Sequence, residues 1–462
     1  MTDRVLFLTG HLAHDRLERV LAGARDLPFA WKVRDIGVKV AALMTEAIIT
    51  HRLGGPLDAD RVVLPGRCRV DLARLSDAFG VPFERGPDEL KDLPAWFGRR
   101  GRPPDLSRHD LRIFAEIVDA SAMTLDAVLA RASAMRAAGA DVIDIGCRPD
   151  TPFPHLEDTV RALAAAGFAV SVDSASADEL ARGANAGADY LLSLTAETLD
   201  VAAGTAAVPV LIPSSPGDLA ELLRTAGEAQ RRGMRVILDP VLDPIHFGFT
   251  ASLERYAQLR RALPDAEILM GTGNLTELTD ADSAGVTAVL AGICSELGIR
   301  NVLVVQVSPH TRRTVQEHDA ARRLMFAARA DGGLPKRYSD ALIALHDRAP
   351  FPNGPGEIAD LAAQVKDGNF RIEVACDGIH VYNRDGHHVG PDAMSLYPRL
   401  GVAADGAHAF YLGTELTKAE IAFRLGKRYA QDAPLDWGCA ADAEGEDLTA
   451  PRPAGPTRTP GA

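Results

Sequence analysis

The feature that most constrains the fold is a unit that recurs between about residues 110 and 330, roughly every 20 to 35 residues. Each unit has an Ala-rich helical stretch, a turn with glycine, a short apolar segment and a polar residue at the end of that segment. The predicted strands are Arg112–Val118, Asp141–Gly146, Ala169–Asp173, Tyr190–Leu194, Val208–Pro213, Arg235–Asp239, Ile268–Gly271 and Asn301–Val307. Eight such units predict a closed (β/α)8 TIM barrel over residues 108–332, and an open doubly wound sheet is the alternative.

A different pattern comes before the barrel. Short apolar segments such as Val5–Leu8 and Arg61–Leu64 are each followed by a helical stretch. Alternating strands and helices predict a small, doubly wound, flavodoxin-like α/β domain over residues 1–100. The Pro- and Arg-rich segment Gly101–Asp105 ends it.

The region after the barrel has another character. Residues 335–440 contain the apolar strands Phe370–Val374 and Ile379–Tyr382, joined by hairpin turns, and a helix is expected over Leu412–Tyr429. This pattern predicts an α+β domain. Residues 441–462 have no apolar period, and we expect a disordered tail.

Composition excludes several classes of partner. The 462 residues include 50 Lys and Arg against 63 Asp and Glu, a net charge of −13. Nucleic acid and anionic membranes require a dominant basic face, so neither is expected as a partner. No segment has the apolar length of a membrane helix or of a signal-peptide core. The five cysteines are scattered and form no C-x-x-C pair, so we expect a soluble, cytoplasmic protein.

Two carboxylates are the sharpest candidates for ligand binding. Asp173 and Asp239 each end an apolar strand, and the mouth of a barrel lies where its strands end. A buried carboxylate needs a partner, and a ligand with an amidine-like pair of N–H groups would satisfy it. Capping of the following helices is the alternative role. We favour the ligand.

Small and basic residues follow the last two strands, where barrels often bind phosphate. Small residues let backbone N–H groups approach an oxyanion, and arginine adds charge, although a solvated helix start explains the Arg pair equally well. The candidate phosphate ligands, with one arginine after the second strand, are Gly271, Thr272, Gly273, Arg148, Ser308, Arg312 and Arg313.

Metal ligands are suggested only weakly. Glu116, in the first strand, and Asp119, just after it, are the candidates in the barrel. Further along the chain, histidines gather near a predicted hairpin turn, but their spacing matches no metal motif and exposure at the turn is the favoured explanation. The residues of this possible C-terminal site are His387, His388, His408 and Tyr411, with His380 nearby.

Four motifs of the barrel region resemble, in order and approximate spacing, those of pterin-binding barrels, a superfamily that includes dihydropteroate synthase and methyltetrahydrofolate:corrinoid methyltransferases. They are Ala140–Gly146, Val170–Ser174, Ala186–Asp189 and Ile237–Pro240.

The whole chain more closely resembles dihydropteroate-synthase-like proteins of archaea and methylotrophic bacteria that are associated with tetrahydromethanopterin biosynthesis. The segments outside the barrel that carry this resemblance are Thr9–Ala13, Val40–Thr45, Leu64–Gly66, Asp377–Asn383 and His408–Gly413.

The resemblance implies a transferase. Asp173 and Asp239 would bind the amino-pyrimidinone edge of a pterin, and the other pterin-site candidates are Asn274, Glu116 and Ser193. In the synthases a dihydropterin-methyl diphosphate loses pyrophosphate, assisted by Mg²⁺, and an arylamine takes the methylene group. A homodimer is expected.

The chain also departs from the synthase pattern. Glu116 stands in a strand motif that usually carries Asn, Gly273–Leu275 replaces a usual Ser-Arg-Lys run, and Val305–Ser308 lacks the usual Arg and His. Ser193, after Leu192, stands where the fourth strand usually carries Asn. These losses make condensation with 4-aminobenzoate less favoured.

Ribofuranosylaminobenzene phosphate is the expected replacement, with Arg148, Arg312 or Arg313 meeting its phosphate. Two alternatives stay open. One is a non-catalytic pterin-binding carrier or scaffold, and the other, which Asn274 suggests, is a pterin-dependent methyltransferase with a corrinoid partner.

Overall fold

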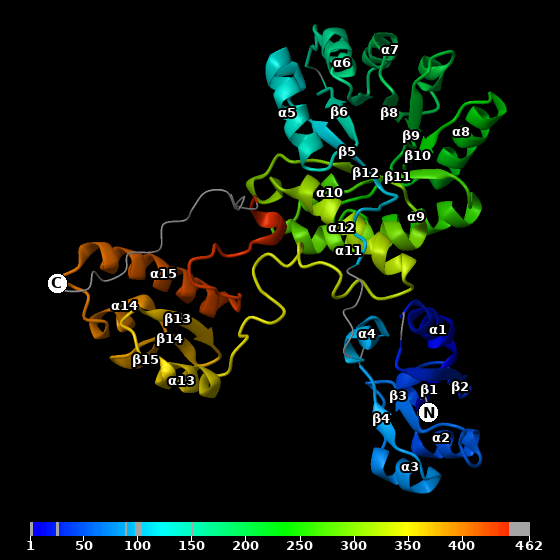
Figure 1. Cartoon of the computed structure of the whole chain (residues 1–462). Coiled ribbons are helices and arrows are strands. Elements are labelled where there is room, and N and C mark those ends of the chain that lie inside the picture. Colours follow the sequence, from blue (N-terminus) through cyan, green and yellow to red (C-terminus); the bar gives the residue numbers. More distant parts are fainter. Residues whose placement is uncertain (1–2, 25–26, 88–89, 98–103, 150, 443–462) are drawn as a thin grey trace. The chain divides into compact units, whose positions relative to one another are not determined.

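The computed structural model describes residues 3–24, 27–87, 90–97, 104–149 and 151–442 (Figure 1). All but the first two residues of the predicted tail therefore fall outside the described residues. Contacts within the chain define two compact units, residues 1–105 with 328–334 and residues 106–327 with 335–462. The first unit thus includes a short segment that the sequence pattern assigned to the barrel.

The first unit contains a four-stranded parallel sheet in the order β2-β1-β3-β4. Alternate residues of its strands face opposite sides, so Val5 and Phe7 pack with α1 and α4, while Leu6 and Leu8 pack with α2 and α3. The sheet is therefore covered by helices on both faces. Its elements are β1 Asp3–Thr9, α1 His14–Gly23, β2 Phe29–Asp35, α2 Glu46–Leu53, β3 Arg61–Leu64, α3 Leu72–Phe79, β4 Phe83–Arg85 and α4 Leu93–Trp96.

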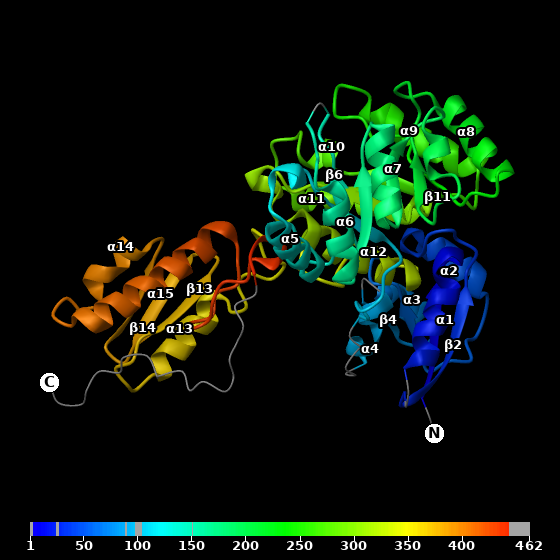
Figure 2. The ribbon, with the colours of Figure 1, turned by 90° about the horizontal axis from the view of Figure 1, so that it is seen from above.

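The second unit begins with a closed barrel of eight parallel strands, and this prediction is confirmed. The ring runs β5-β6-β7-β8-β9-β10-β11-β12 and closes by pairing of β12 with β5. Figures 1 and 2 show the helices of this region around the outside of the strands. The strands are β5 Arg112–Ile117, β6 Val142–Gly146, β7 Ala169–Asp173, β8 Tyr190–Leu194, β9 Val208–Leu211, β10 Ile237–Leu238, β11 Glu267–Gly271 and β12 Asn301–Val304.

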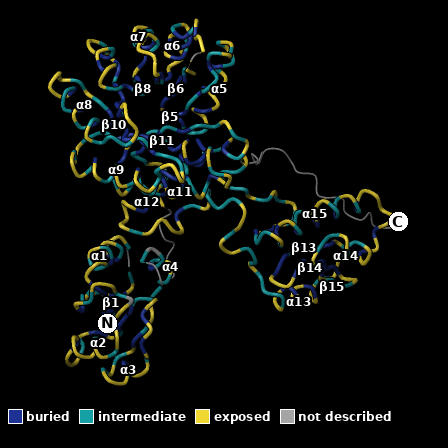
Figure 3. Tube along the Cα trace, turned by 180° about the vertical axis from the view of Figure 1, so that it is seen from behind, coloured by how far each residue is buried: buried dark blue, intermediate teal, exposed yellow. Residues whose placement is uncertain are grey.

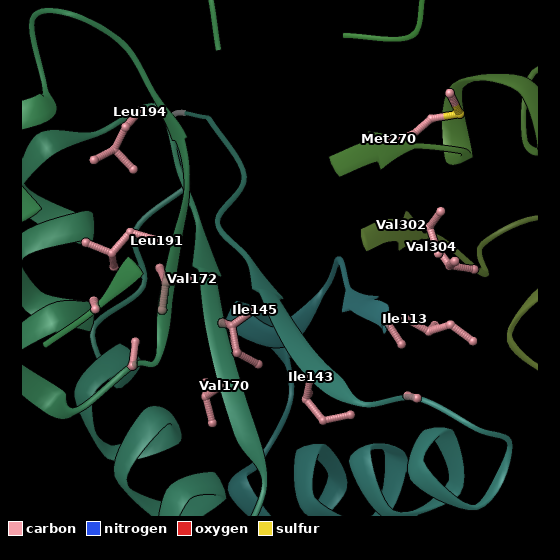
Figure 4. Packing of buried hydrophobic residues seen from close by; sticks show 14 of the residues in the cluster. Ile113, Ile143, Ile145, Val170, Val172, Leu191, Leu194, Met270, Val302 and Val304 are labelled. Carbon is pink, nitrogen blue, oxygen red and sulfur yellow. The ribbon is translucent and has the colours of Figure 1, made fainter. Parts of the chain in front are cut away.

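The helices pack on the outward-facing side chains of the strands. Ile113, Ile143, Val170 and Leu191 are among the buried residues of this shell (Figure 4). Two of the helices, α6 and α7, are followed by the left-handed glycines Gly167 and Gly187 (φ 76° and 99°), which turn the chain into β7 and β8. The barrel helices are α5 Leu125–Ala137, α6 Leu156–Ala165, α7 Ala177–Ala186, α8 Leu219–Arg231, α9 Phe249–Ala262, α10 Gly273–Thr276, α11 Ser283–Leu297 and α12 Thr314–Ala330.

Several barrel strands are shorter than predicted, and the two largest differences have identifiable reasons. The strand expected to reach Asp239 ends at Leu238, because Pro240 has no N–H and Val241 has a φ of +66°. The strand expected to reach Val307 ends at Val304, because the backbone N–H of Val307 donates to the Glu277 carboxylate instead of to a neighbouring strand.

The C-terminal region forms an antiparallel sheet in the order β13-β14-β15. Its long helix begins six residues earlier than predicted, because Asp405 caps it by accepting from the His408 N–H, and it ends at Leu425, before the left-handed Gly426 (φ 62°). The elements are α13 Pro355–Gln364, β13 Arg371–Ala375, β14 Gly378–Asn383, β15 Gly386–Gly390, α14 Ala393–Leu396 and α15 Gly406–Leu425.

Many of the buried residues lie on the strands of the three sheets (Figure 3). Among the described residues, none of the helices has the length and apolar character that crossing a membrane requires.

Candidate active site

Four carboxyl groups collect inside the barrel near the carboxyl ends of its strands. The barrel interior is filled lower down by residues such as Phe114 and Val142. Two positions further along the same strands, on the same face, stand Glu116 and Asp144. These two residues are directly paired in the β5–β6 ladder. Period-two alternation therefore places acidic side chains on top of an apolar interior layer.

Asp144 is the most deeply buried of the four, with 0% of its surface exposed. Its Oδ1 accepts a hydrogen bond of 2.5 Å from Ser171 Oγ on β7, and its Oδ2 has no partner within the described part of the chain. An unpartnered carboxylate oxygen in such a place strongly disfavours the ionised form. Burial, with the neighbouring charges of Asp173 and Glu116, raises the pKa of Asp144 well above its ordinary value.

Asp239 keeps one oxygen available. Its Oδ1 accepts from the Tyr256 hydroxyl at 2.7 Å and from the Val241 N–H at 2.8 Å. Its Oδ2 accepts no hydrogen bond from the described residues, and it is the nearest atom, at 4.0 Å, to where a Cβ on Gly271 would lie. Burial raises the pKa of Asp239 to about 6, and the charge of Asp173 adds to that effect.

Glu116 and Asp173 influence each other. Burial and the charge of Asp173 raise the pKa of Glu116 to about 7, and no hydrogen bond from the described residues reaches its carboxylate. Burial also raises the pKa of Asp173, and a hydrogen bond from Ser193 opposes this effect. Burial thus disfavours the charged forms of these carboxyl groups, and a ligand that donates N–H groups would stabilise those charged forms.

Ser193 reaches Asp173 through an irregular strand. The pairing of β8 with β9 shifts register between Leu191 and Leu194, and Ser193 has a φ of +64°. A non-glycine residue in this region is strained, and such strain is concentrated at functional sites. The bulge re-aims the side chain into the barrel mouth.

A cavity of about 570 Å³ borders two members of the cluster, Glu116 and Asp173, and its volume is suited to a small ligand. Glu116, Asp173 and Ser193 line it, and Arg148, which is exposed, is the one Lys or Arg among its described lining residues. An adjoining cavity of about 540 Å³ shares Arg148 and Cys147 with it. The site is thus acidic at its base with a single cation at its rim.

The predicted ligand-binding residues that follow β11 make hydrogen bonds and packing contacts within the barrel. Both the N–H and the hydroxyl of Thr272 donate to the Leu303 carbonyl, and a Cβ on Gly273 would lie 2.8 Å from Val305 Cγ2. Asn274 is exposed, and its Nδ2 donates to the Leu242 carbonyl at 2.8 Å. Both donors of Thr272 are therefore already used within the barrel, and Gly273 serves close packing. Phosphate binding by these residues stays a prediction.

A carboxylate occupies the predicted phosphate loop after β12. Glu277 accepts from the N–H groups of Val307 and Ser308, at 2.8 and 2.9 Å, and from the Thr311 hydroxyl at 2.7 Å. These are the donors that an anion at Ser308 would need. A phosphate ligand at Ser308 stays a prediction, and a phosphate there would compete with the Glu277 carboxylate for these donors.

The two arginines of this loop are also engaged. Arg312 donates to the Pro309 carbonyl at 3.2 Å. Arg313 donates to the Cys439 carbonyl at 3.0 Å and forms an ion pair of 2.7 Å with Asp442. Phosphate binding by either arginine stays a prediction and would compete with these contacts.

The predicted C-terminal site is divided between two faces of a sheet. His387 stands opposite Tyr382 in the β14–β15 ladder, and its Nε2 lies 2.9 Å from His380 Nδ1. His408 and Tyr411 belong to α15, which packs on the other face, as Figure 1 shows with α13 and α15 on the two sides. His388, next to His387 in the strand, points away from it. These residues do not form one site.

Sequence inspection missed four residues that shape the sites: Asp144, Ser171, Tyr256 and Glu277. A signal for the first two existed, because period-two alternation from Val142 on β6 and from Ala169 on β7 places them inside the barrel. No local signal connects Tyr256 with Asp239 or Glu277 with Ser308. In the described chain no group of three or more His, Cys, Asp or Glu has the arrangement of a metal site, so Mg²⁺ binding at Glu116 and Asp119 stays a prediction.

Comparisons with known proteins give similarities at two levels. Residues 3–88 match a family of unknown function, DUF6513. An uncharacterized protein of Methanocaldococcus jannaschii is 29% identical over 525 residues, which cover 94% of this chain and 99% of that protein.

Dihydropteroate synthases of known structure cover about half of the chain. The Yersinia pestis enzyme is 23% identical over 49% of this chain and 95% of its own, with a TM-score of 0.38. The Vibrio fischeri enzyme is 20% identical over 49% and 94%, with a TM-score of 0.38. The Thermus thermophilus enzyme in complex with 4-aminobenzoate is 23% identical over 48% and 95%, with a TM-score of 0.37.

Proposed function

We propose that the barrel binds a dihydropterin-6-methyl diphosphate and joins its methylene carbon to an arylamine, with loss of pyrophosphate. The observation that carries the proposal is the pair Glu116 and Asp173, which line the cavity and have raised pKa values. Asp144 and Asp239 are buried close enough for their carboxyl groups to interact with this pair, and burial raises their pKa values as well. Such a site requires a ligand rich in N–H donors.

A pterin meets this requirement. Its amino-pyrimidinone edge presents adjacent N–H groups, which a carboxylate accepts bidentately. Asp239 Oδ2 and the Asp173 carboxylate would accept them, and the proton held by Glu116 or Asp144 could meet the pterin's carbonyl or ring nitrogens. The motif resemblance described above supports the same ligand.

The reaction needs orientation and charge stabilisation more than a nucleophilic residue. The amine lone pair forms a C–N bond to the methylene carbon, the C–O bond to diphosphate breaks, and the amine loses a proton. Arg148, at the cavity rim, would meet the departing pyrophosphate. In its ionised form Glu116, with Asp119, would hold Mg²⁺, which would supply further neutralisation of that charge.

The second substrate is proposed to be an arylamine with its own phosphate, ribofuranosylaminobenzene phosphate, as in tetrahydromethanopterin biosynthesis. The adjoining cavity shares Arg148 with the pterin cavity and offers room beside it. An arylamine placed there would approach the methylene carbon from the rim.

The test is a reconstitution with the full chain. Protein, dihydropterin-methyl diphosphate, Mg²⁺ and either ribofuranosylaminobenzene phosphate or 4-aminobenzoate are mixed, and pyrophosphate and the condensed pterin are measured. Product with the phosphorylated amine supports the full proposal, whereas product with 4-aminobenzoate alone contradicts the choice of amine. An Asp239→Asn variant controls for contaminating activity.

A pterin-binding carrier is the second candidate, because Arg148 is the one Lys or Arg among the described lining residues. Tight pterin binding without pyrophosphate release at any amine concentration would favour it. Methyl transfer from a methylated pterin to an added corrinoid protein would favour the methyltransferase alternative instead.

A further inference from the structure

A second cavity lies in the first unit, far in sequence from the acidic cluster. Its volume is about 530 Å³, within the range of small-molecule sites. Phe7 to Thr9 at the end of β1 and Val63 to Pro65 at the end of β3 form its base. The segments Thr9–Ala13, Val40–Thr45 and Leu64–Gly66, which the barrel chemistry leaves without a role, each supply part of its wall.

The position of this cavity in the sheet is the first argument. In the order β2-β1-β3-β4, the chain leaves β1 toward one edge of the sheet and leaves β3 toward the other. The carboxyl ends of these two neighbouring strands therefore diverge, and a crevice forms between their loops. Open α/β sheets bind ligands at this switch point.

The rim of the cavity is apolar yet held in place. Leu12, Val40 and Leu334 line it with 67%, 43% and 61% of their surfaces exposed. Backbone hydrogen bonds from His11 N to Val38 O (2.8 Å) and from Leu12 N to Lys39 O (3.3 Å) tie the two loops together. Exposed apolar side chains gathered around one opening mark a binding surface.

Gly10 makes this arrangement possible. A Cβ on Gly10 would lie 2.7 Å from the Val38 carbonyl oxygen and 2.8 Å from the Ala41 nitrogen. The turn after β1 can therefore approach the loop after β2 closely, and the rim is formed before any ligand arrives.

Charge supplies the last argument. The chain carries 13 more acidic than basic residues, yet the described residues around this cavity include no Asp or Glu, and its charged members are Arg16 and Arg67. Arg16 donates one guanidinium N–H to the Gly332 carbonyl at 3.2 Å, which anchors the side chain and leaves other donors of the fork for a ligand. An apolar wall with arginine at its edge recognises an aromatic body that carries an anion.

We propose that the first unit contains a small-molecule site in addition to that of the barrel. This site binds a compound with a flat apolar ring system and a carboxylate or phosphate group. The ring system lies against Leu12, Val40 and Leu64, and Arg16 binds the anion. The site is independent of the chemistry proposed for the barrel.

The test uses three probes of one shape on the full chain: naphthyl phosphate, naphthoate and the neutral naphthalenemethanol. Calorimetry should show that at least one anion binds about tenfold more tightly than the neutral probe, since a charge-assisted hydrogen bond has that effect. The preferred anion distinguishes phosphate from carboxylate ligands. Hydrogen exchange should show protection at residues 8–16 and 62–67.

Two variants with matched controls locate the effect. Arg16→Met should weaken anion binding about tenfold and leave the neutral probe unchanged, whereas Arg19→Met, on the same helix, should change neither. Leu12→Asp should weaken all three probes, whereas Val289→Asp, at an equally exposed position of α11, should not. Unfolding midpoints check that each variant folds.

Three results would overturn the proposal: no binding of either anion at millimolar concentration, equal binding of charged and neutral probes, or protection only in barrel peptides. None of them bears on pyrophosphate release by the barrel.

Discussion

A Cβ on Gly146 would lie 2.3 Å from Glu116 Oε1, so the glycine that ends β6 creates the space in which the carboxylate of β5 lies. The next nearest atoms are the Glu116 Cδ and the Val118 Cα, both at 3.3 Å. A side chain at position 146 therefore displaces the Glu116 carboxylate more readily than the backbone. The acidic cluster depends on the absence of one methyl group.

Gly146→Ala should consequently weaken pterin binding about tenfold while the barrel stays folded, because one carboxylate of the cluster moves out of place. Titration calorimetry with a dihydropterin measures the effect. Gly285→Ala, in α11, is the matched control, since a Cβ there meets no atom within 4 Å. Unchanged affinity in Gly146→Ala would show that Glu116 does not contribute to binding.

The Tyr256 hydroxyl should lower the pKa of Asp239. Tyr256→Phe removes a hydrogen bond that lowers the Asp239 pKa, so that pKa should rise above about 6 and the pH midpoint of pterin binding should rise with it. Asp239→Asn should abolish binding. An unchanged pH midpoint in Tyr256→Phe would contradict this role of the hydroxyl.

Glu116 should make the protein less stable at higher pH. Its pKa rises from 4.5 to about 7 on folding, so the folded state binds the proton more tightly than the unfolded chain. Its contribution to stability is greatest below pH 4.5 and is lost as the pH rises through about 7, a change on the order of 3 kcal/mol.

Glu116→Gln should therefore stabilise the protein at pH 8 and change little at pH 4, as urea unfolding at both pH values would measure. The exposed Glu254→Gln is the control. Equal effects of the two substitutions would contradict the burial of an ionisable Glu116.

Asp144 should be neutral at pH 7, because Oδ2 lacks a partner and burial raises its pKa. Asp144→Asn imitates the protonated form and should change the free energy of unfolding by less than about 1 kcal/mol. Ser171→Ala removes the partner of Oδ1 and should destabilise the protein by about 1–3 kcal/mol. Denaturant titrations at pH 7 compare them, and a large loss in Asp144→Asn would mean that the charged form is required.

The barrel could be predicted from the sequence because its strands are short and apolar and most of them follow an Ala-rich helix, a pattern that local physics imposes. The same pattern placed Asp173 and Asp239 at strand ends, and the structure brings the charges of these two residues within reach of each other. Strand ends were less predictable. They depend on where a distant group, such as Glu277, captures a backbone N–H.

The features that could not be predicted depend on contacts between residues that are far apart in the sequence. The backbone N–H of Ser308 donates to Glu277, a partner 31 residues away that no local pattern indicates. The histidines near residue 387 are close in sequence to His408, yet the two faces of a sheet separate them, and only the pairing of β14 with β15 reveals that His387 contacts His380. The residue types indicate the chemistry of these groups, but they do not indicate which other groups lie next to them in the fold.

The left-handed glycines Gly167 and Gly187 turn the chain at the amino ends of β7 and β8, opposite to the acidic cluster. Polypeptide inserted after either glycine would extend from the far end of the barrel. The protein can thus carry a reporter or an immobilisation tag within its chain while the ligand entrance stays unobstructed.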